Sequence, residues 1–311
     1  MSGSSHSPGH AHGHSHGVGA SGVRLLISCA ITLAILVAQG IGAVWSGSLA
    51  LAADTGHVAV DSLGLVIAAL ASRLIARPAS SGMSYGLIRV EGVAAAIQSI
   101  MIFAICVVIG VEAVGRLWAS EAVDGWAMSG WAVAGLVGNI VVMIVLSGKR
   151  NDNLNIKAAF LEVAIDAASS VAVIVGGALV AVTGLTWIDV VISLVIALAM
   201  VPRAWVLLRQ ATAMLLDSVP SGLSVDEIRE HIEGVAGVEG VHDLHIWQPR
   251  SGFVLVTAHV IVADDVLEQG RGQEVLTLLH ECMLTHFPIP IEHATFQVES
   301  QAHSAGEVVC H

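Results

Sequence analysis

The sequence of 311 residues has little charge and few cysteines, and each shortage excludes some classes of protein. Charged residues make up 12% of the chain and hydrophobic residues 55%, which is too apolar for an ordinary soluble domain and typical of a membrane protein. The formal net charge of −12 argues against nucleic acid as a partner. The four cysteines form no Cys-x-x-Cys pair, so neither a disulfide framework nor a thiolate zinc site is indicated.

Long apolar stretches dominate what remains, and a helix that crosses a bilayer needs roughly 20 mainly apolar residues. We expect six such helices, at Arg24 to Trp45, Gly47 to Ala76, Val90 to Trp118, Trp126 to Leu146, Ile156 to Val182 and Trp187 to Leu208. The predicted fold is therefore an α-helical membrane domain over residues 23–208, followed by a small cytosolic α+β domain over residues 209–300. Residues 1–22 and 301–311 are expected to be disordered tails.

Basic residues set the expected orientation, because Lys and Arg favour the cytoplasmic side of a membrane. They flank the second and fourth loops and follow the sixth apolar stretch, whereas the first and fifth loops carry none. Arg116 is the one basic residue on the opposite side. Both termini of this integral, multi-pass protein are therefore predicted to be cytosolic. No cleavable signal peptide is recognisable, so we expect the first helix to be retained. Compact loops favour a bacterial inner membrane over an organellar one.

Two apolar stretches carry ionisable residues in their middle, where a charge costs several kcal/mol unless it faces a polar pathway. His57 and Asp61 are spaced i, i+4, and so are Glu162 and Asp166. This spacing puts each pair on one helical face, with side chains about 6 Å apart. The two helices run in opposite directions, and each pair lies roughly 12 to 18 Å from its entry surface, near the middle of the bilayer. The four side chains are therefore predicted to surround one divalent cation.

Other polar residues in the membrane stretches have simpler interpretations. Asp54, one turn before His57, either helps to admit or orient the ion or is a helix-end carboxylate in contact with water. Glu112 and Arg116 are spaced i, i+4 and are expected to form an interfacial ion pair.

The region after the last apolar stretch has an α-β-β-α-β pattern. Ser224 and Glu227 predict a capping box for a helix that ends near Gly234. Two strands, a helix and a third strand are expected to follow, at Gly240 to Gln248, Gly252 to Val262, Asp265 to His286 and Glu292 to Ser300. Strand alternation predicts that His242 and His245 lie on opposite faces of the sheet.

The first 22 residues alternate Gly, Ser and His. This tail is either a solvated segment or a loose imidazole chelator that raises the metal concentration near the cytosolic mouth and lends a histidine to another site. Its histidines are His6, His10, His12, His14 and His16.

Several motifs together resemble those of the cation diffusion facilitator family, in particular its bacterial zinc, cadmium and cobalt exporters. The resemblance covers residues 24–300 and depends on Gly47-Ser-Leu-Ala-Leu-Ala-Ala-Asp-Thr-Gly-His-Val-Ala-Val-Asp, Tyr85-Gly with Arg89 and Glu91, Val241-His-Asp-Leu-His-Ile-Trp, Ala258-His-Val and Thr295-Phe-Gln-Val-Glu. It implies a homodimer of six-helix protomers with a metallochaperone-like, ferredoxin-like cytosolic domain. It also implies a transporter rather than an enzyme, which exports a divalent metal in exchange for protons.

The resemblance also implies two sets of metal ligands. His57, Asp61, Glu162 and Asp166 match the transport site, and His242, His259 and Glu299 match a cytosolic site that relatives complete with a histidine from the partner's amino-terminal tail. Glu162 stands where zinc exporters of this type usually have histidine. An oxygen donor there should weaken discrimination against Mn²⁺, Fe²⁺ or Co²⁺. Zinc also accepts carboxylate ligands, so Zn²⁺ is the expected substrate and regulatory ion, and no organic cofactor is expected.

Three carboxylates and one imidazole cannot stay buried together without a cation, so protons should occupy the empty site and compete with the metal. An unperturbed histidine titrates at about 6.5, which makes His57 the expected coupling group. The cytosolic domain is expected to sense metal and clamp the dimer, supported by an ion pair between Asp217 and Arg73 or Arg77. The rival hypotheses are export of Cd²⁺, Co²⁺, Mn²⁺ or Fe²⁺, a membrane-anchored metal sensor without translocation, and, more weakly, an intramembrane hydrolase, for which no His-Glu-x-x-His motif is present.

Overall fold

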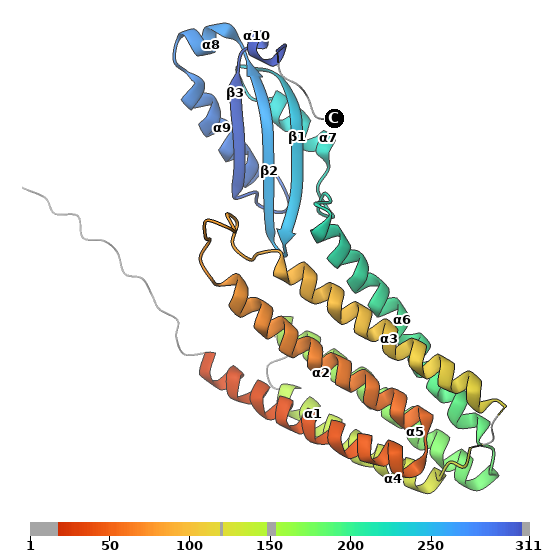
Figure 1. Ribbon diagram of the computed structural model, residues 1–311. Helices are drawn as coiled ribbons and strands as arrows, with labels where there is room; N and C mark the ends of the chain where they lie inside the picture. The colour runs from red at the N-terminus through yellow and green to blue at the C-terminus, as the bar shows by residue number, and fades with distance from the viewer. Residues whose placement is uncertain (1–17, 119–120, 148–153, 307–311) are drawn as a thin grey trace, which may run out of the picture. The chain divides into compact units, whose positions relative to one another are not determined.

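The computed structural model describes residues 18–118, 121–147 and 154–306. For residues 18–29 and 154–159 it describes the backbone alone. Six long helices precede a small α+β domain (Figure 1). The helices are α1 (Val18–Ser46), α2 (Leu49–Ile75), α3 (Val90–Arg116), α4 (Gly125–Ser147), α5 (Leu154–Thr183) and α6 (Trp187–Leu215). Helices α2 to α6 are long and apolar enough to cross a membrane, and Ala30–Ser46 of α1 is a shorter apolar segment. The prediction of six membrane helices is confirmed.

Two helix boundaries differ from the sequence prediction. Helix α1 begins at Val18, inside the predicted tail, because adding a residue to a formed helix costs less than starting a new one. The histidines before it lie outside the described residues. Helix α6 continues past Leu208 to Leu215, since Ala211, Ala213 and Met214 favour helix even where the chain turns polar.

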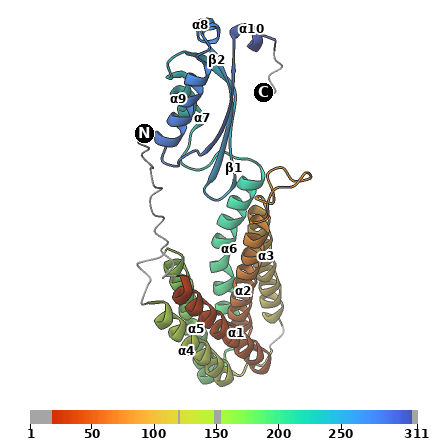
Figure 2. The same ribbon diagram turned by 90° about the vertical axis from the view of Figure 1, so that its left-hand side faces the viewer.

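The chain divides into two compact units, residues 1–62 with 105–199 and residues 63–104 with 200–311. In the first unit α1, α4 and α5 lie side by side (Figure 2). A Cβ on Gly125 would approach the carbonyl oxygen of Gly177 to 2.4 Å, and a Cβ on Gly177 would approach Ser129 Oγ to 2.5 Å. Glycine at both positions therefore allows α4 and α5 to pack backbone against backbone.

The start of α2 is fixed by Asp189 at the start of α6. Asp189 is fully buried and accepts hydrogen bonds from Ser48 Oγ at 2.6 Å, Leu49 N at 2.7 Å and Ala50 N at 3.1 Å. It thereby satisfies amides that a helix N-terminus leaves without an intrahelical partner. Gly47 precedes this end with a φ of 67°, a conformation that glycine adopts without strain.

Arg116 has a wider role than the predicted ion pair. The pair with Glu112 is confirmed, with Nε and Oε1 3.2 Å apart. Arg116 also lies 3.1 Å from Glu121 and 3.8 Å from Asp189, and donates to the carbonyl oxygen of Gly47 at 2.6 Å. The guanidinium therefore joins the ends of α2, α3 and α6.

The second unit contains the domain that follows α6. Its elements are α7 (Val225–Glu233), β1 (Val238–Arg250), β2 (Phe253–Val262), α8 (Asp264–Glu268), α9 (Gly272–Thr285), β3 (His293–Glu299) and α10 (Gln301–Ser304). The sheet has the order β1-β2-β3, with β1 antiparallel and β3 parallel to β2. The α-β-β-α-β prediction is confirmed.

Two details of this domain correct the sequence prediction. The single helix expected at Asp265 to His286 is interrupted at Gly270, whose φ of 69° leaves α8 and α9 separate. The tail predicted to be disordered from residue 301 begins with the short helix α10, because Ser300 caps it by accepting from the amide of His303 at 3.3 Å. Ser224 caps α7 by accepting from the amide of Glu227 at 3.5 Å, which is one of the two hydrogen bonds of the predicted capping box.

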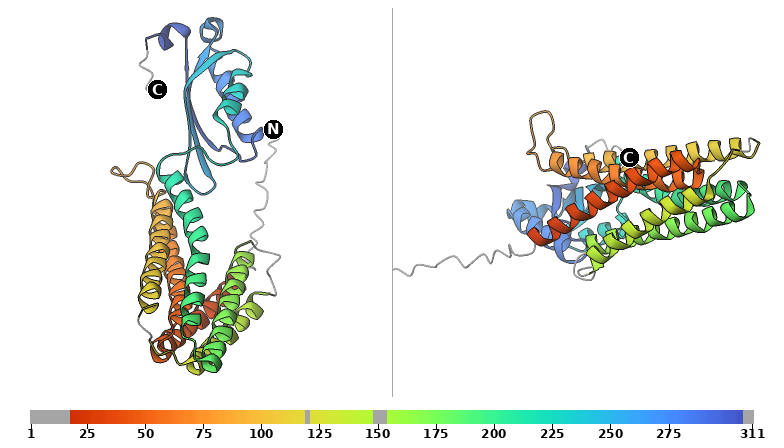
Figure 3. Two further views of the ribbon diagram at one scale, coloured as in Figure 1. Left: turned by 90° about the vertical axis from the view of Figure 1, so that its right-hand side faces the viewer. Right: turned by 90° about the horizontal axis from the view of Figure 1, so that it is seen from below.

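Helices α7 and α9 cover one face of the sheet (Figure 3). Ile228 and Ile232 of α7 and Leu279 and Met283 of α9 are fully buried against alternate residues of β2. The other residues of β2, among them Thr257 and His259, therefore point to the opposite face. That face carries the histidines of the domain's candidate metal site.

An ion pair near the start of this domain differs from the one expected. Asp217 pairs with Arg89, at 3.0 Å, rather than with Arg73 or Arg77. Asp217 adopts a φ of 54°, which ends α6 and turns its carboxylate toward the start of α3. All three arginines lie near the predicted membrane border, so their positions in the sequence do not show which of them pairs with Asp217.

Candidate metal centres

The structure brings together three of the four predicted transport ligands within the first unit. His57 and Asp61 lie on consecutive turns of α2, and Asp166 faces them from α5. His57 Nε2 is 3.2 Å from Asp166 Oδ1 and 3.5 Å from Asp61 Oδ2. All three residues are buried, with exposed fractions between 7% and 9%. Helices distant in sequence thus converge on a small polar cluster in an apolar bundle.

The spacing of this cluster fits a tetrahedral metal ion. Two donors that each lie 2.0 to 2.1 Å from zinc are about 3.3 Å apart at the tetrahedral angle. The distances from His57 Nε2 to the two carboxylates are close to this value. A divalent cation would also neutralise carboxylates that are otherwise expensive to bury in a membrane. The cluster therefore offers one nitrogen and two oxygen ligands to a single ion.

Glu162 is not part of this cluster. It lies one turn before Asp166 on α5 and is half-buried, and its carboxylate is outside the group of donor atoms within 4.8 Å of one another. Its role as the fourth ligand stays a prediction.

Asp54 is a buried residue whose hydrogen-bond partners come from two other helices. It is 1% exposed, so the interpretation as a carboxylate in contact with water is wrong. Its partners are Gln39 of α1 and Ser169 and Ser170 of α5. The apolar sequence around Asp54 indicated burial, but its partners come from helices whose packing the sequence did not predict.

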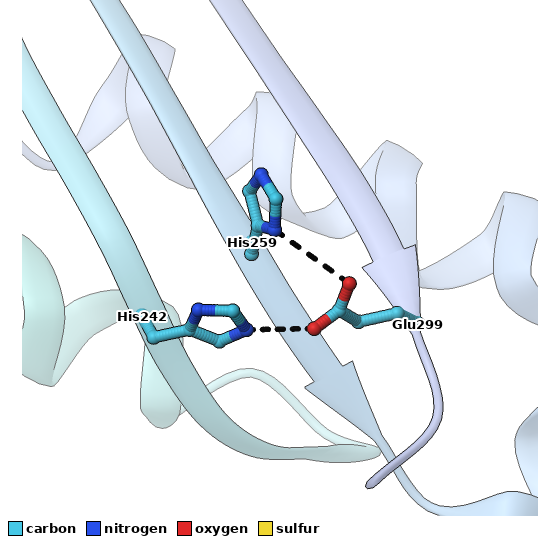
Figure 4. Close-up of side chains that lie close together, drawn as sticks. All are labelled: His242, His259 and Glu299. Atoms are coloured by element: carbon cyan, nitrogen blue, oxygen red, sulfur yellow. Dashed lines mark hydrogen bonds and ion pairs between the residues drawn. The ribbon is translucent and has the colours of Figure 1, made fainter. Parts of the chain in front are cut away.

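The three predicted cytosolic ligands also lie together, on the sheet face away from α7 and α9 (Figure 4). His242 Nε2 is 2.6 Å from Glu299 Oε1, and His259 Nδ1 is 3.6 Å from Glu299 Oε2. The two imidazole rings have centroids 5.0 Å apart. Each strand of the sheet supplies one ligand, so the pairing of the strands sets the geometry of the site.

His242 and His245 lie on the same face of the sheet, contrary to the alternation rule. His242 pairs with His259 and His245 pairs with Thr257, two positions that share a face of β2. The register shift between the two histidines is a β-bulge, and Asp243 within it has a φ of 50°. An extra residue in a strand restores the same face after three positions. The opposite-face prediction was therefore wrong.

The bulge places Asp243 beside the site, where sequence reasoning had assigned it no role. Its Oδ1 is 3.0 Å from His245 Nε2, and its Oδ2 is 3.9 Å from His259 Nε2. Ser304 of α10 is a second missed neighbour, with Oγ 3.1 Å from His242 Nε2. The Ser-x-x-His-Ser pattern after the last strand was the available signal for this capped turn.

Glu299 is held in its ionised form by its neighbours. Burial alone would raise the pKa of Glu299, but hydrogen bonds from His242 and Gln297, together with the charges of His242 and His259, hold the pKa below its ordinary value. Burial in the core raises the pKa of the Cys282 thiol, so this side chain is a packed thiol rather than a thiolate ligand. The metal-binding character of the site therefore comes from imidazole and carboxylate.

Comparisons with known proteins agree with this architecture, both in the membrane helices and in the domain that follows them. Residues 25–216 match the model of the cation efflux transmembrane domain, and residues 220–301 match that of the cation efflux protein cytoplasmic domain. The metal cation efflux system protein CzcD of Cupriavidus metallidurans is 36% identical over 96% of this chain and 90% of its own length.

Two further relatives have names that specify metals. The cadmium, cobalt and zinc/H(+)-K(+) antiporter of Bacillus subtilis is 32% identical over 92% of this chain and 91% of its own length. The zinc transporter ZitB of Escherichia coli is 32% identical over 89% of this chain and 87% of its own length. With two family models covering the membrane helices and the domain that follows them, the chain belongs to the cation efflux, or cation diffusion facilitator, family.

Proposed function

We propose that this protein exports a divalent metal cation, with Zn²⁺ as the main substrate, in exchange for protons. The observation that supports this most strongly is the buried cluster of His57, Asp61 and Asp166, whose donor spacing suits one ion. The names of the relatives, which include cadmium, cobalt and zinc, support the substrate class. The transporter is proposed to lie in a bacterial inner membrane with both termini in the cytosol.

Protons and metal compete for the same lone pairs in this mechanism. A metal ligand must be deprotonated, so an ion arriving from the cytosol displaces protons from His57 and the carboxylates. Glu162, one turn from Asp166, completes the site by a side-chain rotation when the ion arrives. The helices then open the cluster to the other side, where protons return to the ligands and the ion leaves. The antiporter name of the Bacillus relative supports such coupling.

The cytosolic cluster is proposed to be a regulatory site in a homodimer. His242, His259 and Glu299 provide three ligands, and a tetrahedral ion needs a fourth, which a histidine of the partner's tail can supply. Metal binding would then favour the dimer arrangement that transports.

Reconstitution of the full chain in liposomes tests the proposed exchange. Zinc flux should rise when a pH gradient is imposed, and it should disappear in Asp61→Asn, which removes a ligand charge without changing size. The matched control is Asp265→Asn, an exposed carboxylate of the soluble domain, which should transport normally. Flux that ignores the pH gradient would reject the proton coupling. Flux that survives Asp61→Asn would reject this cluster as the transport site, whereas an unmodified chain that moves no zinc would favour a sensor without translocation.

A further inference from the structure

A second buried polar cluster in the membrane helices lies outside the ligand set and is centred on Asp54. Its carboxylate accepts a hydrogen bond from Gln39 Nε2 at 2.8 Å, a second from Ser169 Oγ, and a longer one from Ser170 Oγ at 3.4 Å. Asp54 and Gln39 are each 1% exposed and Ser170 is fully buried. One carboxylate therefore joins α1, α2 and α5 in the interior of the first unit.

The cluster is adjacent to the ligands on both helices. Asp54 lies three residues before His57 on α2, and Ser169 lies three residues after Asp166 on α5. Ser169 Oγ also contacts the carbonyl oxygen of Asp166 at 2.9 Å. Because Asp189, just after α5, caps the start of α2, the beginning of α2 and the end of α5 lie at the same end of the bundle. Asp54 and Ser169 are thus one helical turn from the ligands, toward that same end.

The surrounding helices are shaped to hold this arrangement. A Cβ on Gly135 of α4 would approach Gln39 Nε2 to 2.4 Å, so glycine there leaves the space that the amide occupies. A carboxylate buried among apolar helices is costly unless donors satisfy it, and here the donors come from two other helices. Separating α5 from α2 would break the serine hydrogen bonds and leave Asp54 with Gln39 as its remaining hydrogen-bond donor among those the structure describes.

We propose that Asp54 is a positioning residue for ion transport, which holds α5 against α2 one turn from the ligands and so sets the separation of His57 and Asp166. This inference rests on the proposed function. The 3.2 Å between those two ligands suits a tetrahedral ion, and a displacement of α5 by even an ångström would spoil it. With the predicted orientation, the cluster lies on the side by which the ion leaves.

Zinc transport by variants of the full chain in liposomes tests this role. Asp54→Ala should raise the KM for zinc on the order of tenfold, as loss of a group that supports metal ligands typically does, while the maximal rate changes about twofold or less. Asp54→Asn should largely restore the KM, because an amide of the same size still accepts from Gln39 and still bonds a serine hydroxyl. The matched control is Ser193→Ala, which removes a fully buried hydroxyl that, within the part of the chain the structure describes, donates to the carbonyl oxygen of Val190 on its own helix, and which should leave the KM unchanged.

A second pair of variants keeps the test valid if Asp54→Ala does not fold. Ser169→Ala with Ser170→Ala removes the donors of α5 and should raise the KM in the same direction. When the two serine changes are combined with Asp54→Ala, the fold-increase in KM should be much smaller than the product of the two separate fold-increases. The reason is that both changes remove the same hydrogen bonds between α2 and α5. An unchanged KM in Asp54→Ala and in the serine variant would overturn the proposal. An Asp54→Asn variant with a KM as high as that of Asp54→Ala would also overturn it, because the negative charge of Asp54 rather than its hydrogen bonds would then matter. A wild-type chain that moves no zinc would instead refute the proposed function.

Discussion

At the scale of single residues, Glu162 is the predicted fourth ligand of the transport site, at a position where the family resemblance implies histidine in zinc exporters. Replacing it by histidine adds a second nitrogen donor to the transport site, and nitrogen ligands favour zinc over manganese. Glu162→His should therefore raise the preference for Zn²⁺ over Mn²⁺ in competition flux assays, by roughly tenfold. The control is Glu121→Gln, a half-exposed carboxylate at the far end of the helices, which should leave the preference unchanged. An equal metal preference in wild type and Glu162→His would show that residue 162 is not a ligand.

Glu299 makes a second prediction at this scale, because its pKa is lowered in the folded domain by His242 and Gln297 despite burial. A lowered pKa means that the ionised carboxylate stabilises the fold above its unfolded value of 4.5, and that this contribution is lost as pH falls through the folded pKa. With a chelator present, hydrogen exchange in β1 to β3 should be slower in wild type than in Glu299→Gln at neutral pH. The difference should shrink below about pH 4.5. A difference that persists unchanged into strong acid would contradict this assignment.

At the scale of elements, the N-terminus of α2 depends on a residue that is distant in the sequence. Asp189→Ala should lower the free energy of unfolding by roughly 3 kcal/mol, since it leaves two amides, a serine hydroxyl and Arg116 without their buried acceptor. Unfolding by detergent titration measures this change. Glu112→Ala is the control, because it removes a half-exposed partner of the same arginine and should cost below about 1 kcal/mol. An equal loss of unfolding free energy in the two variants would show that Asp189 does not stabilise the N-terminus of α2.

The elements also show where sequence reasoning succeeded and where it failed. Hydropathy predicted the six spans, and the period of the helix predicted that His57 and Asp61 share a face, because both depend on local spacing. The bulge at Asp243 could not be predicted, since an inserted strand residue has no hydrophobic signature. The choice of Arg89 for Asp217, and of Gln39 and Ser169 for Asp54, depends on tertiary packing between segments far apart in the chain.

At the scale of the whole molecule, the cytosolic site is expected to regulate transport by the dimer. Replacing His242 and His259 together by alanine should remove the metal-dependent activation of flux while leaving the transport site intact. The matched control is His293→Ala, an exposed histidine at the start of β3 that lies outside the ligand set. A flux that responds to metal as in wild type after loss of both histidines would show that the domain does not sense metal.

The central claim is that α2 and α5 hold one metal ion between His57, Asp61 and Asp166, with Glu162 joining them. X-ray absorption spectroscopy of zinc bound to the purified chain tests this most directly, in a variant whose cytosolic and tail histidines, His242, His259, His6, His10, His12, His14 and His16, are replaced. We predict one zinc per protomer with a single imidazole nitrogen and otherwise oxygen ligands, and loss of that ion on adding Asp61→Ala. A zinc ion with several imidazoles or a sulfur ligand, or one that remains after Asp61→Ala, would contradict the account.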